Sequence, residues 1–161
     1  MTTEMGLQPP TSIDWLLTQP YFFALFFCTV WALACFVIGL ISGWNVLSNR
    51  FSISKGTFHG ETWPFRSARM RFLAHYGNCL SIGADESGLY MSVFPIFRIG
   101  HPPLLIPWAE IAVLPGETGL IFKQRTLHLG RQEAIPLRIS ASLAETLQRA
   151  AGKGWSVASV A

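Results

Sequence analysis

Basic charge is absent from nearly the first third of this chain. The first 49 residues contain no Lys or Arg, and their two acids are Glu4 and Asp14. A secretory signal peptide begins with a basic segment and ends at an Ala-x-Ala-like site. Both features are missing around the apolar run that follows residue 20. The absence argues against a cleaved signal, which is the main competing interpretation of that run.

Cysteine is also scarce. The chain has three cysteines and four histidines, and they form no Cys-x-x-Cys pair and no Cys/His cluster. Disulfide-stapled domains and zinc sites both need such spacings. The sequence therefore predicts neither a disulfide framework nor a metal site.

Catalytic motifs are missing in the same way. There is no G-x-S-x-G, no phosphate loop and no metal-binding histidine pair. His101 with Glu110, or His59 with Glu61, are the pairs that could act as a base with an orienting carboxylate. Spacing alone supports neither pair, so we expect no enzyme activity and no cofactor.

The chain does contain one long apolar run. Residues 21–41 carry no charge, and Thr29 is their only polar side chain. As a helix, 21 residues span ~31 Å, close to the ~30 Å core of a bilayer. We predict a short outer segment at 1–19, a transmembrane helix at 20–47 and a connector at 48–57. A soluble core helix rarely contains so long a run.

Charge predicts how this helix is oriented. All 12 Lys and Arg lie after it, and residues 44–161 carry seven acids, for a net charge of +5. Basic flanks stay on the cytoplasmic side. We expect the N-terminus outside and the main domain in the cytoplasm.

Small residues recur along the apolar run every three or four positions, which keeps them on one helical face. They are Ala24, Cys28, Ala32, Cys35, Gly39 and Gly43. Such a stripe lets another membrane helix approach closely. We expect it to contact a second copy or a different membrane protein, although Gly and Ala are common in spans by chance.

Several basic residues follow the span closely. They are Arg50, Lys55, Arg66, Arg69 and Arg71. Near an anionic leaflet each such charge contributes about 1 kcal/mol of attraction. The alternative is that they only set topology and solubility. Nucleic-acid binding is disfavoured, because the net charge is modest and the aromatic residues are dispersed.

From residue 57 onward, short alternating runs between Gly and Pro turns predict six or seven antiparallel strands. Two of these runs flank the acidic turn 85–88 and predict a hairpin. A strand over 104–111 contains Pro107, which predicts an edge or a bulge. Ser140 is a helix cap before 141–151, where Leu143 and Leu147 share a face.

This order of elements resembles the pleckstrin-homology-like superfold, including GRAM and bacterial PH domains, over residues 58–152. The segments 60–63, 88–92 and 101–111 are similar to those of uncharacterised bacterial single-pass membrane proteins. The resemblance implies a bacterial inner-membrane protein and brings no known activity with it. We expect one transmembrane helix, then a mainly-β, PH-like barrel or sandwich with a C-terminal helix, and a tail at 153–161.

Two functions fit this organisation. In the first, a membrane-anchored cytoplasmic module docks a protein partner, or another copy of itself, at the inner membrane. In the second, a domain for envelope maintenance binds lipid or a small ligand in the barrel mouth. The bilayer itself is a partner in both.

Overall fold

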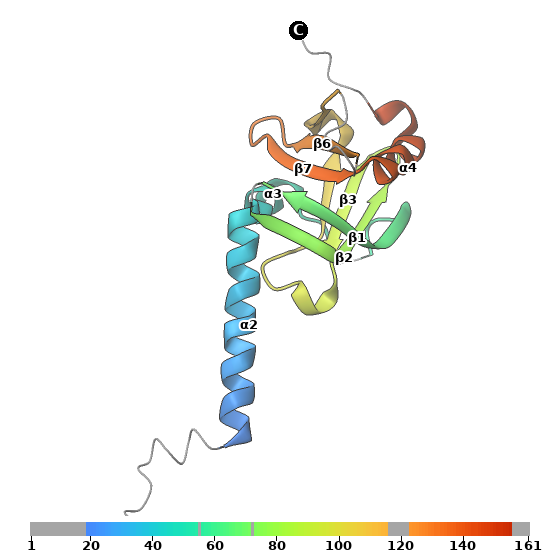
Figure 1. The fold of residues 1–161 in the computed structure, drawn as a ribbon. Coiled ribbons are helices and arrows are strands. Elements are labelled where there is room, and N and C mark those ends of the chain that lie inside the picture. The colour runs from blue at the N-terminus through green and yellow to red at the C-terminus, as the bar shows by residue number, and fades with distance from the viewer. Residues whose placement is uncertain (1–18, 55, 72, 116–122, 156–161) are drawn as a thin grey trace, which may run out of the picture. The chain divides into compact units, whose positions relative to one another are not determined.

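The computed structural model describes residues 19–54, 56–71, 73–115 and 123–155. The chain divides into two compact units, one ending at Ala34 and the other beginning at Cys35. Figure 1 shows an apolar helix followed by a curved sheet and a C-terminal helix. The expected fold class is confirmed: the sheet is an antiparallel near-barrel of seven strands.

The apolar run forms α2, from Pro20 to Ser42. Among the described residues it is the one helix whose length and composition suit a membrane span, and a signal sequence meets the same test. Its polar side chain Thr29 is satisfied inside the helix, because Oγ1 donates to the Leu25 carbonyl at 2.8 Å. Nothing polar in the middle of α2 therefore needs water.

A sharp break ends α2 sooner than residue 47, which was the expected end. Gly43 has φ of 82°, a left-handed conformation that glycine adopts without steric cost. A second helix, α3, then runs from Trp44 to Phe51. Its residues Trp44, Leu47 and Phe51 recur at helical spacing and are buried in the core of the β-domain.

The compact unit therefore begins well before residue 58, the boundary expected from the strand pattern. Trp44 and Leu47 have no exposed surface. The Trp44 indole Nε1 also donates to the Pro102 carbonyl at 2.8 Å. Residues 44–51, which were expected to be the end of the transmembrane helix and the start of the connector, therefore belong to the core of the barrel.

The strands are β1 (Glu61–Met70), β2 (Ala74–Ala84), β3 (Gly88–Val93), β4 (Leu104–Pro107), β5 (Ile111–Val113), β6 (Gln124–Leu129) and β7 (Ile135–Ser140). Their order in the sheet is β4-β3-β2-β1-β7-β6-β5. The β1–β7 pairing is short and joins Arg69 to Arg138 and Met70 to Leu137. Among the described residues, most of β1 has no partner strand on that side.

The expected hairpin is present as β2 and β3, with Ala84 opposite Leu89. Asp85 closes its turn, because the carboxylate accepts from the backbone N–H groups of Ser87 at 2.8 Å and Gly88 at 3.1 Å. An Asp side chain that mimics a backbone turn is a strong local signal. This is why the sequence pattern located the turn correctly.

The expected strand at 104–111 is divided in two. β4 ends at Pro107, a 3₁₀ turn (η2, Trp108–Glu110) follows, and β5 begins at Ile111. Proline has no N–H to continue a ladder, so the chain leaves the sheet there. The run 120–123, which the alternating pattern also predicts to be a strand, lies outside the described residues except for Lys123, and so do residues 156–161 of the expected tail.

The C-terminal helix α4, from Ala141 to Ala151, packs on β2, β3, β6 and β7. Ser140 caps it as expected, since its hydroxyl accepts from the Leu143 N–H at 3.3 Å. Leu143 and Leu147 are buried in the same core as Leu89, Met91 and Val93. Figure 1 shows α4 against the barrel strands.

Candidate functional site

The last two turns of α2 belong to the same compact unit as the β-domain and lie directly against it. Cys35 and Gly39 are buried there. A Cβ on Gly39 would lie 2.9 Å from the Gly100 carbonyl oxygen, closer than a real Cβ can approach. Glycine is therefore needed at residue 39 for the helix and the loop to touch.

A buried polar network joins this part of α2 to the barrel. The hydroxyl oxygens of Tyr76 and Ser42 are 3.0 Å apart, and the Tyr76 hydroxyl is 2.9 Å from Nε2 of His101. Nδ1 of His101 is 3.0 Å from the carbonyl of Ile99, which can only accept. The neutral imidazole thus carries its proton on Nδ1, and Nε2 and the Ser42 hydroxyl oxygen are the two acceptors within reach of the single Tyr76 hydroxyl proton.

Burial sets the protonation of this network. It raises the pKa of Tyr76 to about 12, with the Ser42 hydrogen bond lowering it in part. Burial also lowers the pKa of His101, while the Ile99 and Phe97 carbonyls act in the opposite direction. Removing a charged form from water disfavours it, so both side chains are neutral near pH 7.

A cavity of about 220 Å³ lies beside this network. Its lining is mostly apolar and includes Cys35, Ile38, Cys79 and Phe97. Although two cysteines and two histidines line it, no three metal-ligating side chains converge in the part of the chain that the structure describes. The cavity therefore provides no metal centre among these residues.

A larger groove, of about 520 Å³, opens beside the short pairing of β1 with β7. We call it the basic groove, and it is lined by residues 67–69, 75, 123–124 and 138–142. In the strand register Arg69 stands opposite both His75 on β2 and Arg138 on β7. Cross-strand partners have Cβ atoms ~4.5–5.5 Å apart. The side chains of Arg69 and Arg138 are therefore direct neighbours on one face of the sheet.

The two arginines of the groove lack acidic partners. Among the described residues, no ion pair within 4 Å involves Arg69 or Arg138, whereas Arg50 makes two. Like charges directly opposite each other destabilise a sheet. A costly arrangement without a counter-charge among the described residues is a reason to expect an anion from outside.

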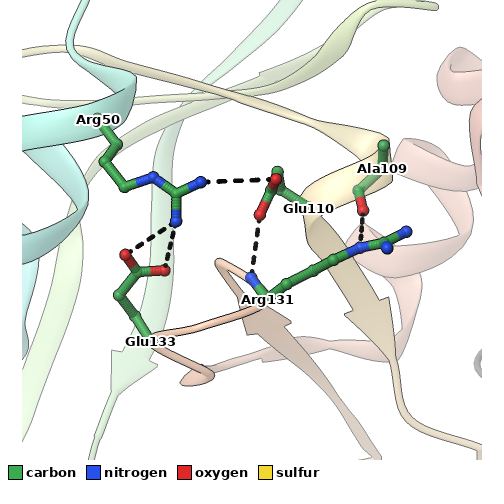
Figure 2. Close-up of polar contacts among 5 residues, drawn as sticks. All are labelled: Arg50, Ala109, Glu110, Arg131 and Glu133. Atoms are coloured by element: carbon green, nitrogen blue, oxygen red, sulfur yellow. Dashed lines mark hydrogen bonds and ion pairs between the residues drawn. The ribbon is translucent and has the colours of Figure 1, made fainter.

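Arg50, expected among the juxtamembrane basic residues, shows the opposite arrangement, because it has acidic partners within the chain. Its Nη1 donates to both carboxylate oxygens of Glu133, at 3.0 and 3.1 Å, and Nη2 lies 3.6 Å from Glu110 (Figure 2). Arg131 holds Glu110 through a backbone N–H at 3.1 Å. The hydrogen bond raises the pKa of Arg50 and lowers that of Glu133. Arg50 links α3 to the Glu110 and Glu133 carboxylates of the barrel.

The other predicted basic residues are distributed unevenly. Arg66, Arg69 and Arg71 are exposed on β1 or just after it, and Nη1 of Arg71 is 3.5 Å from the Ile41 carbonyl at the end of α2. Lys55 lies outside the described residues. Of the expected juxtamembrane set, Arg69 is the member that lines the basic groove.

The small-residue stripe is divided between two environments. Ala24 and Cys28 are exposed and Ala32 is half-buried, while Cys35, Gly39 and Gly43 are buried in the unit that begins at Cys35. A Cβ on Gly43 would lie 2.7 Å from Ile135 Cδ1. The expectation that Gly39 and Gly43 contact another membrane helix is therefore corrected: they contact the chain's own barrel.

The sequence did not predict the network of Ser42, Tyr76 and His101. His101 does not meet Glu110, the partner considered from spacing, because that carboxylate is held by Arg50 and Arg131. A polar Ser42 directly after an apolar helix, between two glycines of the stripe, was the available signal.

Comparison with known proteins identifies no family for this chain. No protein-family model, no curated protein and no solved structure matches the chain. The structure itself shows one long apolar helix, then a seven-stranded antiparallel near-barrel with a C-terminal helix.

Proposed function

We propose that this protein is a membrane-anchored binding module whose basic groove holds the phosphate of an anionic membrane lipid. The observation that carries the proposal is the row formed by His75, Arg69 and Arg138 on three neighbouring strands. The role is binding and not catalysis, and it develops the lipid-binding alternative of the two expected functions.

The chemistry of the groove suits a phosphate oxygen. A guanidinium group presents N–H donors in a planar fork that matches phosphate geometry, and charge-assisted bonds of this kind are about twice as strong as neutral ones. Hydroxyl groups of Ser67 and Ser142 also line the groove. A bound phosphate would replace repulsion between Arg69 and Arg138 by two attractions.

The position of the groove favours a lipid as the source of that phosphate. Arg71, beside the Ile41 carbonyl, is two residues from Arg69, which at ~3.3 Å per residue is about 7 Å along the chain. His75 lines both the basic groove and the cavity formed with Cys35 and Ile38 of α2. If α2 spans the bilayer, the groove lies within about one Debye length of the headgroups.

We place the domain on the cytoplasmic side of a bacterial inner membrane. The support is the absence of Lys and Arg before the span and the presence of 12 after it. The test is a cysteine introduced at exposed Glu145 of α4 in a variant without the native three. Labelling by a membrane-impermeant reagent only after lysis is expected, and labelling in intact cells would contradict this orientation.

The binding test uses the full chain in mild detergent. Short-chain phosphatidylglycerol should raise the melting temperature of the wild type, and zwitterionic phosphatidylcholine should not. Arg138→Gln should weaken the lipid effect by about 10–100-fold in affinity, the equivalent of the ~1.5–3 kcal/mol of a charged hydrogen bond. Lys153→Gln is the matched control, because it removes an exposed charge outside the groove.

One feature separates binding from general stability. Without lipid, Arg138→Gln should be at least as stable as the wild type, because it removes like-charge repulsion across the β1–β7 pair. If glycerol phosphate stabilises the protein to the same extent as the lipid, the ligand is a soluble phosphate compound. An equal loss of lipid stabilisation in Lys153→Gln, or no loss of it in Arg138→Gln, would refute lipid binding in the basic groove.

A protein partner is the second candidate, and one observation favours it. Residues of β1 before Arg69 lack a strand partner on the β7 side, and such an edge can accept an extended segment of another protein. The bulges between Trp63 and Ala68 interrupt this edge. A stoichiometric partner recovered in mild detergent with the wild type, and still recovered with Arg138→Gln because that variant leaves the β1 edge intact, would favour this candidate, as would self-association through Ala24 and Cys28.

A further inference from the structure

Apolar side chains are exposed on the loop between β3 and β4. We call residues 94–100 the Phe94 loop, and it contains a 3₁₀ turn (η1, Pro95–Phe97). Phe94, Ile96 and Ile99 are 46%, 58% and 47% exposed. Phe65 of β1 is exposed beside them, with its ring centroid 6.1 Å from that of Phe94. A loop surrounded by water rarely exposes so many apolar side chains together.

The loop lies against α2 before the end of that helix. A Cβ on Gly100 would be 3.2 Å from Cα of Phe36, and one on Gly39 would be 3.3 Å from the His101 ring. Phe36 is six residues before Ser42, the last residue of α2. At ~1.5 Å per residue, the contact is about 9 Å along the helix from its end.

We propose that the Phe94 loop enters the headgroup and acyl boundary of the leaflet next to the domain, as a second membrane contact. The proposal rests on α2 spanning the bilayer, which is part of the proposed function, and not on the basic groove. The bilayer is the occupant because the exposed patch is continuous with the span: a membrane that covers Phe36 must also reach the loop packed against it.

Several backbone N–H groups of the loop have hydrogen-bond partners within the chain. The N–H of Phe94 donates to the Cys79 carbonyl at 2.8 Å, and that of Phe97 donates to the Phe94 carbonyl at 2.9 Å. Arg98 N–H donates to Pro95 at 3.3 Å, and Pro95 itself has no N–H to satisfy. Irregular backbone enters the apolar boundary only when its polar groups have partners, and the N–H groups of Phe94, Phe97 and Arg98 have them.

Arg98 fits the same position. It is half-buried next to exposed Ile99, and its Nε has no hydrogen-bond partner among the described residues. Long basic side chains at a membrane boundary lay their stems on apolar surface and extend their charge to the headgroups.

The test measures depth in the full-length protein, reconstituted in phosphatidylcholine–phosphatidylglycerol vesicles. In a variant whose three native cysteines are alanine, Ile96→Cys is labelled with an environment-sensitive fluorophore. Nitroxide groups carried on the lipid chains, near the ~5–10 Å depth of interfacial segments, are the quenchers. Val37→Cys on α2 is the control for the span, and Glu145→Cys on exposed α4 is the control for water.

We expect the labels at positions 96 and 37 to lose most of their emission and the label at position 145 to keep it. Quenching at 37 without quenching at 96 would overturn the loop contact and leave the span intact. No quenching at 37 would overturn the span itself, and the inference with it. A blue-shifted but unquenched label at 96 would overturn the lipid contact and show that protein, such as a second copy, covers the loop.

A second readout covers the case in which the cysteine-free chain does not fold. A diazirine-bearing amino acid introduced at position 96 of the otherwise native protein should crosslink to phospholipid on illumination. The same group at position 145 should not. Crosslinking at 96 exclusively to protein would contradict the proposal.

Discussion

The near-barrel is closed on one side by α4 and contacted on another by the end of α2, and the two contacts are built differently. The α4 contact is apolar: Leu143, Leu147 and Ala151 are buried in the core. The α2 contact combines glycine with polar groups: Gly39 allows close approach, and Ser42, Tyr76 and His101 form a buried network. Closure by α4 needs only apolar surface, whereas the α2 junction depends on shape and hydrogen-bond geometry.

The difference predicts how each contact fails. An apolar contact tolerates changes of shape better than it tolerates a charge. A close-packed polar junction is sensitive to one added carbon or one lost hydroxyl, because buried polar groups must keep their partners. Four sets of variants, each measured by thermal unfolding of the full chain in detergent, test this contrast.

The largest effect is expected at the α4 contact. Leu147 has no exposed surface, so Leu147→Asp buries an unpaired carboxylate and should cost several kcal/mol. Leu147→Ala should cost about 2–5 kcal/mol. Gln148→Ala, on the exposed side of α4, should change stability by less than about 0.5 kcal/mol. Equal stability of Leu147→Asp and Gln148→Ala would disprove closure by α4.

The next largest effect is expected at residue 39. Gly39→Leu forces side-chain atoms against the Gly100 carbonyl and should destabilise the domain by about 1–3 kcal/mol. Ala34→Leu enlarges an exposed small residue of the same helix and should have little effect. If the two variants unfold alike, Gly39 does not hold the junction. A loss of self-association without destabilisation would restore its role as a contact for another helix.

An effect of similar size is expected when one hydroxyl is removed. Tyr76→Phe leaves Nε2 of His101 buried without its partner, at a cost of about 1–3 kcal/mol. The control is Tyr90→Phe, because no described residue makes a hydrogen bond with the Tyr90 hydroxyl, and it should change stability by less than about 0.5 kcal/mol. Similar results for the two tyrosines would mean that the network adds nothing to the junction.

The weakest effect is a dependence on pH. Burial lowers the pKa of His101 below its usual 6.5, so just below pH 6.5 the unfolded chain binds a proton that the folded chain does not. Stability is therefore expected to fall as pH decreases from 6.5 toward the folded-state pKa, and to be independent of this group above 6.5. His101→Gln should remove this part of the slope. An identical pH profile in the two proteins would contradict the assignment.

Local patterns in the sequence were sufficient for the apolar contact. Ser140 followed by Leu143 and Leu147 specifies a capped amphipathic helix, and the acidic turn at Asp85 specifies a hairpin, because each depends on residues a few positions apart. The same patterns led to the fold class. They could not place β4 and β5 correctly, since the break after Pro107 depends on how the sheet edge ends.

The junction and the basic groove depend on contacts that no local pattern encodes. Gly39 meets Gly100 across 61 positions, and Arg69 stands opposite Arg138 across 69. The small-residue stripe correctly indicated close packing but not the partner, because glycine serves a second helix and a loop equally well. Arg50 and Arg69 are alike as juxtamembrane charges in sequence, and only the positions of Glu110 and Glu133 separate them.

The helix α3 has a consequence for how the protein is made. Trp44, Leu47 and Phe51 complete the barrel core, yet they follow α2 after a single glycine. A fragment that begins at residue 58 would lack all three side chains and should fold poorly. If α2 is the proposed membrane span, it emerges first during synthesis, and these core residues lie next to the bilayer until the strands follow. We expect a chain that fails to insert to expose them, and cellular quality control to degrade it.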